Sequence, residues 1–273
     1  DPSSEATLVC FIAVIEDIQA KKQAEQELQQ RAEELTAMNM MLAQTTALLE
    51  QRNQELDQFA YVASHDLKAP LRAIANLSEW IEEDLSGQLP DENQRQLELL
   101  RNRVNRMEGM INGLLSYSRV GRRDRIVEKV NVRQMLADVI DSIAPPAKFR
   151  FELPSTLPVL TTQKIALQQV FANLIGNAVK HHHQDDGMVK VDARPMDSFY
   201  EFTVQDDGPG IEPHYHDKVF VIFQTLKARD EMENTGIGLA IVKKIVEAEG
   251  GMIRLESKPN KGCTFTFTWP ASP

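Results

Sequence analysis

The stretch LQQRAEELTAMNMMLAQTTALLEQRNQEL (28–56) carries a leucine at every seventh residue. The repeat consists of Leu28, Leu35, Leu42, Leu49 and Leu56. Apolar residues at this spacing form one stripe on an α-helix, and two such helices bury their stripes against each other as a coiled coil. No Gly or Pro interrupts the chain between Lys21 and Ala69, so we predict one long helix that pairs with a second copy.

The seven-residue phase continues past the leucine repeat without insertion or deletion. If the leucines occupy position d, position a is filled by Ala32, Asn39, Thr46, Asn53, Ala60, Leu67, Ile74 and Ile81. Polar residues at position a cost stability but favour two strands in fixed register. A single helix packed on its own domain is the alternative reading. We prefer a homodimer, because five heptads show no other partner.

A second helical pattern follows a turn predicted near Gly87. Its apolar residues alternate in steps of three and four: Leu97, Leu100, Val104, Met107, Ile111 and Leu114. The two patterns predict a coiled-coil signalling helix over 19–56 and a helical hairpin over 57–122. Two hairpins would form a dimeric four-helix bundle.

Residues 123–273 alternate short strands, Pro-bounded loops and amphipathic helices, which predicts an α/β sandwich of ordinary domain size. Helices are expected over 131–143, 162–182 and 237–249. Strands are expected over 148–153, 188–194, 199–206, 252–257 and 263–269. At the other end, β-branched and aromatic residues over 6–16 favour a strand, and a lone strand needs a partner from elsewhere.

Composition excludes several classes of protein. The chain holds 40 acidic and 30 basic residues, a formal charge of −10, which disfavours non-specific binding to nucleic acid. Its longest apolar run, LVCFIAVI (8–15), is too short to span a membrane. Cys10 and Cys263 make neither a disulfide framework nor a zinc site, and two isolated thiols fit a reducing compartment. We therefore expect a cytoplasmic location and no membrane span.

The segment FAYVASHDLKAPLRAI (59–74) places His65 at the outward position f of the heptad. A neutral imidazole can be a nucleophile, and the adjacent Asp66 could hold its other ring nitrogen and stabilise positive charge. Lys68 and Arg72 could attract a phosphoryl group. Taken alone, an exposed His-Asp pair is more often an ordinary solvated pair.

Three further segments suggest a site for a nucleotide. Asn173, Asn177 and Lys180 share one stripe of a predicted helix, and amide oxygens suit a magnesium ion with its phosphates. Asp206 ends an apolar strand before a Gly-Pro-Gly turn and could accept a hydrogen bond from an exocyclic amine. The segment NTGIGLAIVKKIVEAEGG (234–251) is a Gly loop that opens into a helix, an arrangement that favours phosphate. Each segment alone is weak evidence.

The order and spacing of these segments resemble the sensor histidine kinases of two-component systems over residues 57–270. The sequence S-H-D-L-K-A-P-L-R is especially similar to that of phytochrome-type and related cytoplasmic sensor kinases. Residues 1–18 resemble the end of a PAS sensor domain. This resemblance implies a Bergerat-type ATP-binding domain, ATP and Mg²⁺ as cofactors, and autophosphorylation on a histidine. It also implies phosphoryl transfer to an aspartate on the receiver domain of a response regulator.

Carried over residue by residue, the resemblance makes His65 the phosphoacceptor, Asp66 its acid/base partner and Asn177 the magnesium ligand. Residues 212–233, with their Phe pair, would form a mobile lid. The implied nucleotide site comprises Asn173, Asn177, Lys180, Asp206, Gly208, Gly210, Ile211, Phe220, Phe223, Thr235, Gly236, Gly238, Leu239 and Thr264.

The chain departs from the family pattern at three places. Asn234 replaces a common Gly, and Asp207 puts a second carboxylate near the expected nucleotide. Ala69 stands where relatives with phosphatase activity carry Thr or Asn, so we expect weak phosphatase activity.

Other classes of protein stay open at this point. They are a pseudokinase scaffold, a gyrase- or MutL-like DNA-dependent ATPase and, less favoured, a leucine-zipper DNA binder. The run His181-His182-His183 is read as a solvated helix end rather than a metal site, because neighbouring helical residues point about 100° apart.

Overall fold

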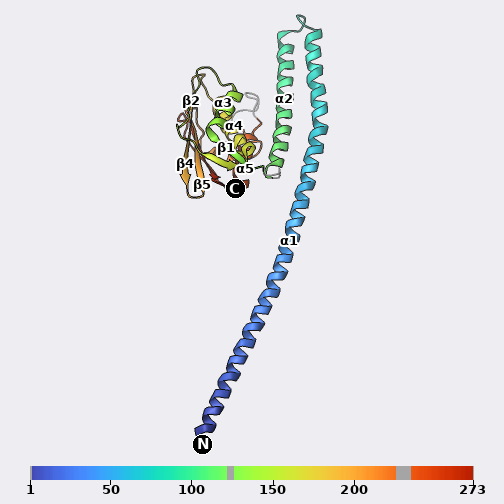
Figure 1. Ribbon diagram of the computed structural model, residues 1–273. Helices are drawn as coiled ribbons and strands as arrows, with labels where there is room; N and C mark the ends of the chain where they lie inside the picture. The colour runs from blue at the N-terminus through green and yellow to red at the C-terminus, as the bar shows by residue number, and fades with distance from the viewer. Residues whose placement is uncertain (1, 122–125, 226–234, 273) are drawn as a thin grey trace. The chain divides into compact units, whose positions relative to one another are not determined.

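The computed structural model describes residues 2–121, 126–225 and 235–272, leaving aside the side chains of 2–20, 50, 56, 57 and 59. The chain divides into two units, residues 1–58 and 59–273. Helix α1 (Pro2–Asp84) runs through both units (Figure 1). None of the helices in the described ranges contains an apolar stretch sufficient to cross a bilayer.

The strand predicted over 6–16 is wrong, because these residues belong to helix α1. A strand satisfies its backbone hydrogen bonds only beside another strand, and no described strand pairs with this segment. A helix satisfies those groups within the segment itself.

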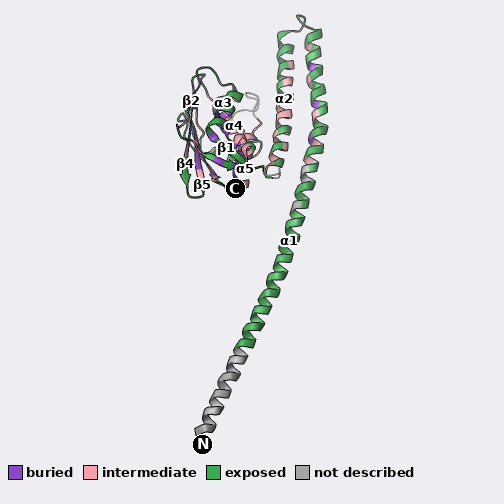
Figure 2. Ribbon diagram, viewed as in Figure 1, coloured by how far each residue is buried: buried purple, intermediate pink, exposed green. Residues whose placement is uncertain are grey.

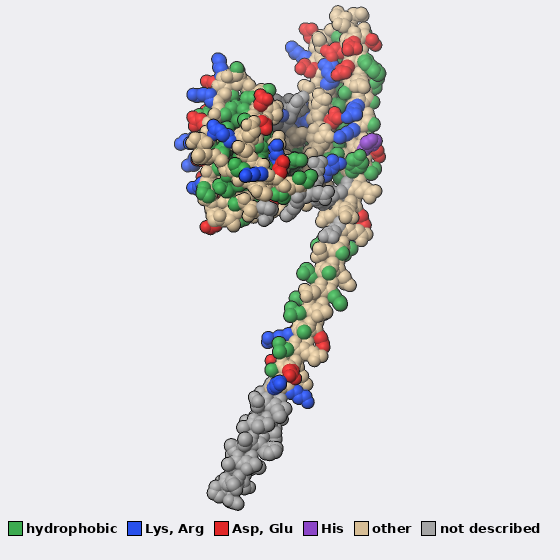
Figure 3. Space-filling view, viewed as in Figure 1, with side chains coloured by type: hydrophobic (Ala, Val, Ile, Leu, Met, Phe, Trp, Pro, Cys, Tyr) green, Lys and Arg blue, Asp and Glu red, His purple; other side chains and the backbone are tan. Residues whose placement is uncertain are grey.

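The first unit consists of α1 alone, and its described side chains are exposed (Figure 2). The exposed residues include Leu28, Leu35, Leu42 and Leu49. Figure 3 shows hydrophobic side chains recurring along this part of the helix. A regular stripe of exposed leucines is costly in water unless another surface covers it.

The second unit begins with a helical hairpin made from the end of α1 and helix α2 (Asp91–Arg119). Ser64, Leu71 and Ser78 are buried in α1, and Val104 is buried in α2. The three α1 residues are seven apart, so they lie on one face of the helix. Ion pairs between Arg101 and Glu82 and between Arg72 and Glu108 also join the two helices.

The hairpin contact uses a different stripe from the one expected. Leu67, Ile74, Leu77 and Ile81 stay exposed on α1, although they carry the a/d pattern. On α2 the expected single seam splits: Leu97, Val104 and Ile111 are covered, whereas Leu100, Met107 and Leu114 are exposed. The inner face of α1 is therefore a mixture of small polar residues and Leu71, while both helices keep apolar residues exposed outside the hairpin.

The α/β part of the second unit contains three helices and seven strands among its described residues. The helices are α3 (Val132–Ile143), α4 (Lys164–Lys180) and α5 (Gly238–Ala248). The strands are β1 (Glu128–Asn131), β2 (Arg150–Glu152), β3 (Val159–Thr162), β4 (Met188–Met196), β5 (Phe199–Asp206), β6 (Ile253–Ser257) and β7 (Cys263–Pro270). Two short 3₁₀ turns, Pro213–Tyr215 and Lys218–Phe220, follow β5.

Five strands form a sheet in the order β2-β4-β5-β7-β6, in which only β2 and β4 run parallel. The three helices form a layer over one face of this sheet (Figure 1). The core between the layers is mainly aliphatic and contains an aromatic cluster, in which Phe171, Phe202, Phe267 and Trp269 are fully buried. Trp269 Nε1 donates to Thr162 Oγ1 at 2.8 Å, so the buried indole N–H has a partner.

The predicted helices and strands of residues 123–273 are all present, but β1 and β3 were missed. These two strands pair only with each other, in an antiparallel ribbon four residues long. β1 has the sequence EKVN, with one buried residue, Val130. One apolar position is too few for a period-two pattern to be visible in the sequence.

Two glycines give a test of the packing. A methyl group on Gly251 would collide with Thr268 O, whereas one on Gly176, inside α4, would meet nothing within 4 Å. Gly251→Ala should lower the free energy of unfolding by about 1–3 kcal/mol, because the backbone of β7 must shift. Gly176→Ala should leave it unchanged or raise it by up to about 1 kcal/mol. Denaturant unfolding measures both, and equal effects would contradict this packing.

Candidate functional site

His65 lies on the solvent side of α1, with 75% of its side chain exposed. Its Nδ1 is 3.2 Å from Asp66 Oδ1. A carboxylate only accepts, so Nδ1 donates in this pair. In the neutral form of the ring, Nε2 then keeps its lone pair and faces solvent, which is the form that a nucleophile needs.

The two cations expected beside His65 have different surroundings. Lys68 is half-buried, and Arg72 Nη2 lies 3.7 Å from Glu108 Oε1 of α2. Glu108 therefore offsets part of the positive charge of Arg72. Pro70 lacks an amide hydrogen, yet α1 continues through it.

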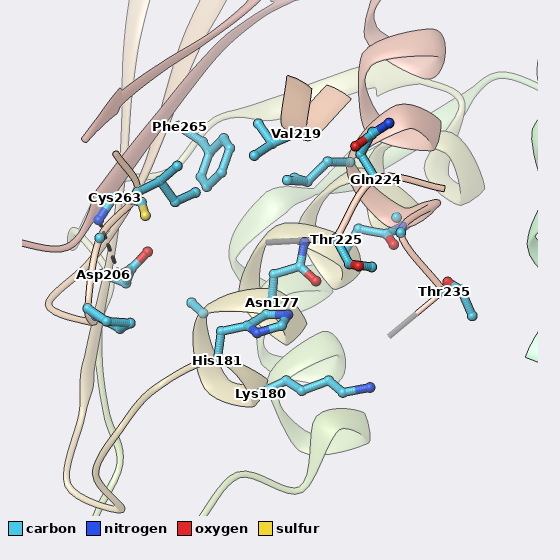
Figure 4. A pocket seen from close by; sticks show the side chains of 18 residues that line it. Asn177, Lys180, His181, Asp206, Val219, Gln224, Thr225, Thr235, Cys263 and Phe265 are labelled. Atoms are coloured by element: carbon cyan, nitrogen blue, oxygen red, sulfur yellow. Dashed lines mark hydrogen bonds between the residues drawn. The ribbon is translucent and has the colours of Figure 1, made fainter. Parts of the chain in front are cut away.

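A cavity of about 440 Å³ opens in the α/β domain beside the carboxyl end of α4 and the start of α5. Figure 4 shows Asn177, Lys180 and His181 extending from the same end of α4 toward it. Asn173 also lines the cavity, and its Nδ2 donates to Gln169 O at 2.8 Å. This bond fixes the amide, and a methyl group on Gly238 would lie 2.8 Å from Asn173 Oδ1.

Asp206 ends β5 and lines the same cavity (Figure 4). Its Oδ1 accepts N–H bonds from Gly208 at 2.9 Å and from Cys263 at 3.2 Å. Burial raises the pKa of the Asp206 carboxyl, and the two backbone bonds and His182 only partly oppose this effect. The carboxylate is thus a fixed, partly desolvated acceptor.

Glycines shape the cavity wall at two places where the backbone adopts positive φ. Gly210 has φ 70°, and a methyl group there would collide with Lys258 O. Gly236 has φ 66°, and a methyl group there would lie 2.6 Å from Gln224 O. Only glycine fits both the dihedral angle and the space at these positions.

Ten of the residues expected at the nucleotide site line this one cavity. They are Asn173, Asn177, Lys180, Asp206, Gly210, Ile211, Thr235, Gly236, Gly238 and Leu239. Residues 226–234, which include Asn234 and the last eight residues of the expected lid, lie outside the described residues.

Four expected residues do not line the cavity: Gly208, Phe220, Phe223 and Thr264. Gly208 acts behind it through its bond to Asp206, and Phe220 packs edge-on against Phe265, which does line it. Phe223 is half-exposed, with φ 66°.

Thr264 was expected at the nucleotide site, but its side chain does not line the cavity. Its neighbours Cys263 and Phe265 line the cavity, and successive side chains of a strand point to opposite faces.

The sequence reading also missed several lining residues, among them His181, Cys263, Phe265, Val219, Gln224 and Thr225. Period-two alternation in β7 was the available signal for Cys263 and Phe265. His181, His182 and His183 were expected to form a solvated helix end, and this prediction is wrong for the first two. His181 lines the cavity, and the side chain of His182 is only 2% exposed.

The thiol of Cys263 is buried in the cavity wall. Burial raises its pKa to about 11, and the charge of Asp206 adds to the effect. At neutral pH this thiol is therefore an apolar surface rather than a nucleophile.

The donor set bears on the expected magnesium ion. Among the described residues, no group of three or more His, Cys, Asp or Glu could hold a metal. The α4 stripe offers neutral amide oxygens beside Lys180. This set fits a hard cation that arrives already bound to phosphates and needs only an additional oxygen from the protein.

The described residues thus combine an exposed histidine on the helical hairpin with a cavity lined by amides, a lysine, a carboxylate and glycines. A model of the "Histidine kinase-, DNA gyrase B-, and HSP90-like ATPase" family matches residues 162–273. A model of the His Kinase A (phospho-acceptor) domain matches residues 55–123. The chain therefore belongs to the histidine kinases.

Known proteins of this family are similar to the chain in sequence and in structure. Phytochrome-like protein Cph1 of Synechocystis sp. is 35% identical over 235 residues, covering 84% of this chain and 31% of Cph1. The chain thus spans about a third of the length of Cph1. Full-length ShkA in complex with AMPPNP aligns with TM-score 0.59 and 25% identity over 78% of this chain and 45% of ShkA. ThkA in complex with the response regulator TrrA aligns with TM-score 0.54 and 21% identity over 81% and 65%.

The raised pKa of Asp206 predicts how stability depends on pH. The folded state binds this proton more tightly than the unfolded chain, so the contribution favours folding at acid pH and is lost as pH rises through the two pKa values. Asp206→Asn keeps an acceptor oxygen but removes the charge. It should raise the melting temperature by a few degrees at neutral pH, with a smaller gain in acid.

Thermal unfolding at several pH values measures this effect. The exposed Asp185→Asn is the matched loss of one charge, and it should give no such pH-dependent gain. A melting temperature for Asp206→Asn that is lower than wild type at neutral pH would contradict the assignment.

Proposed function

We propose that this chain is the kinase core of a two-component sensor protein: it binds ATP, phosphorylates His65 and passes the phosphoryl group to an aspartate of a response regulator. The single observation that carries the proposal is an exposed histidine whose Nδ1 is held by a carboxylate, in a chain that also has an adenine-type pocket.

In the proposed reaction, Nε2 of His65 attacks the γ-phosphorus of ATP. A P–N bond forms, the bond from the γ-phosphorus to the β,γ-bridging oxygen breaks, and ADP leaves. Positive charge develops on the imidazole, and Asp66 at 3.2 Å stabilises it. The transfer relies on positioning and on neutralising phosphate charge.

In the same proposal, the cavity orients the nucleotide. Asp206 accepts a hydrogen bond from the exocyclic amine of adenine, and Lys180 and the α5 N-terminus attract the phosphates. Asn177, with Asn173 beside it, would offer an amide oxygen to Mg²⁺. A bound magnesium ion would neutralise phosphate charge as it builds up.

A homodimer follows from the apolar stripes that the single chain leaves uncovered. The exposed a/d residues of α1 and the exposed row Leu100, Met107 and Leu114 of α2 belong to one hairpin. Burying them against a second hairpin would complete a four-helix bundle, and the heptads of residues 28–56 would extend the contact.

The remaining expectations stay predictions. A response regulator is the partner that the phosphohistidine chemistry requires, and the TrrA complex of ThkA is a precedent for such a pairing. We also propose a cytoplasmic location, and weak phosphatase activity because of Ala69. We further propose that residues 1–18, which lie in helix α1, are the end of a PAS domain.

Labelling with γ-³²P-ATP tests the reaction. Wild-type chain should incorporate label that is labile in acid and stable in alkali, as expected of a P–N bond. His65→Gln, which keeps a polar side chain of similar size but no nucleophilic nitrogen, should incorporate none. His183→Gln, at another exposed histidine that does not line the cavity, should label like wild type.

Two results would support other classes of protein. A folded wild-type chain that binds ATP without becoming labelled would indicate a scaffold. ATP hydrolysis stimulated by DNA would indicate a DNA-dependent ATPase.

Sedimentation equilibrium tests the dimer. Leu77→Glu puts a charge into the exposed a/d stripe and should raise the dimer dissociation constant at least about tenfold. Asn76→Glu introduces the same charge one residue away, at the exposed position c of the heptad, and should have little effect. Equal effects of the two changes, or a monomeric wild type, would contradict the proposed seam.

A further inference from the structure

His182 is a buried histidine at the end of α4, although it follows directly after a residue that lines the cavity. Its ring packs edge-on against Phe149, with centroids 5.4 Å apart. A methyl group on Gly187 would lie 2.8 Å from His182 Cδ2, so the ring is enclosed on that side too. The side chain therefore has one well-defined position.

The hydrogen bonds of His182 hold its ring on both sides. Nε2 lies 3.1 Å from Asp207 Oδ1, and a carboxylate can only accept, so Nε2 donates to Asp207. Nδ1 lies 2.8 Å from the carbonyl oxygen of Gln184 and 3.1 Å from the N–H of the same residue. Both ring nitrogens therefore have a partner within the chain.

Asp207 joins this histidine to the adenine side of the cavity. Its Oδ1 also accepts the N–H of Met188 at 2.7 Å, at the first residue of β4. It directly follows Asp206 in the chain, and Asp207 does not itself line the cavity. The extra carboxylate of the Asp206-Asp207-Gly208 segment thus serves as an anchor behind the nucleotide rather than as a contact.

We propose that His182 and Asp207 are positioning residues that set the carboxylate of Asp206 for adenine recognition. The pair ties the end of α4, which supplies Asn177 and Lys180, to the turn that supplies Asp206. It thereby fixes the spacing between the phosphate end and the base end of the cavity. This inference rests on the proposed binding of ATP.

Base selectivity is the consequence that distinguishes positioning from simple stabilisation. A correctly placed carboxylate accepts from the amine of adenine but faces the carbonyl oxygen of guanine, so it favours ATP over GTP. If the anchor is lost, Asp206 moves and the preference falls. A pair that only stabilised the fold would affect both nucleotides equally.

The experiment measures dissociation constants for ATP and GTP by calorimetry on the full chain, in wild type, Asp207→Ala, Asp207→Asn, His182→Ala and His182→Gln. The alanine variants should bind ATP about tenfold more weakly, the effect of one misplaced hydrogen bond, with GTP nearly unchanged. Asparagine retains an acceptor oxygen, and glutamine can supply a donor near the position of Nε2, so both should restore most of the ATP preference.

The double variant His182→Ala/Asp207→Ala should be no weaker than either single variant, because the two residues act as one unit. Asp185→Ala, in the same loop and exposed, is the matched control and should bind like wild type. In the labelling assay the alanine variants should show a raised KM for ATP with kcat retained at saturation.

The outcomes distinguish a failure of the proposed ATP binding from a failure of the positioning role. A folded wild-type chain that does not bind ATP would overturn the proposed function itself. Wild-type binding with an ATP/GTP ratio that the alanine variants leave unchanged would overturn only the positioning role. Equal loss of both nucleotides together with a lowered melting temperature would also overturn it, as would failure of both conservative variants to restore selectivity.

Discussion

A partly buried carboxylate that accepts two backbone N–H groups organises the nucleotide-binding part of this protein. Asp206 Oδ1 joins the end of β5 to the start of β7 through the N–H of Cys263, and it closes its own turn through Gly208. The neighbouring backbone is paired as well, since Gly262 N–H donates to Gly208 O and Asn260 N–H donates to Pro209 O. Burial makes the charge on Asp206 unfavourable, so the site keeps a strained electrostatic balance that an adenine amine would relieve.

The hairpin follows a different principle, because its two helices each carry a covered face and an exposed apolar face. One face is satisfied within the chain by contacts around Leu71 and Val104. The other face, which carries the heptad pattern, remains exposed in the single chain. His65 belongs to neither face, and this leaves its imidazole in solvent. The same helix can thus pack internally, offer a surface for a second copy and display a nucleophile.

The sequence predicted the elements of the α/β domain and most of the cavity because those features have local signals. Period-two and helical patterns identify strands and helices, and Asn173, Asn177 and Lys180 follow from one helical stripe. The predictions that failed concern features that depend on residues distant in the sequence. Thr264 was carried over from the family resemblance, whereas the facing of β7, which turns Cys263 and Phe265 toward the cavity, depends on its pairing with β5. The burial of His182 depends on Phe149 and Asp207. The strand at 6–16 failed because strand propensity says nothing about whether a pairing partner exists.

The protonated thiol of Cys263 has a consequence for chemical probes of this pocket. Electrophilic nucleotide analogues react with thiolates, and a thiol whose pKa is about 11 supplies almost none at physiological pH. Warheads aimed at this cysteine would therefore remain unreacted even when the analogue occupies the pocket correctly. Selective compounds for this kinase core would do better to exploit the small, polarisable sulfur as a place where a compact apolar substituent fits beside the purine.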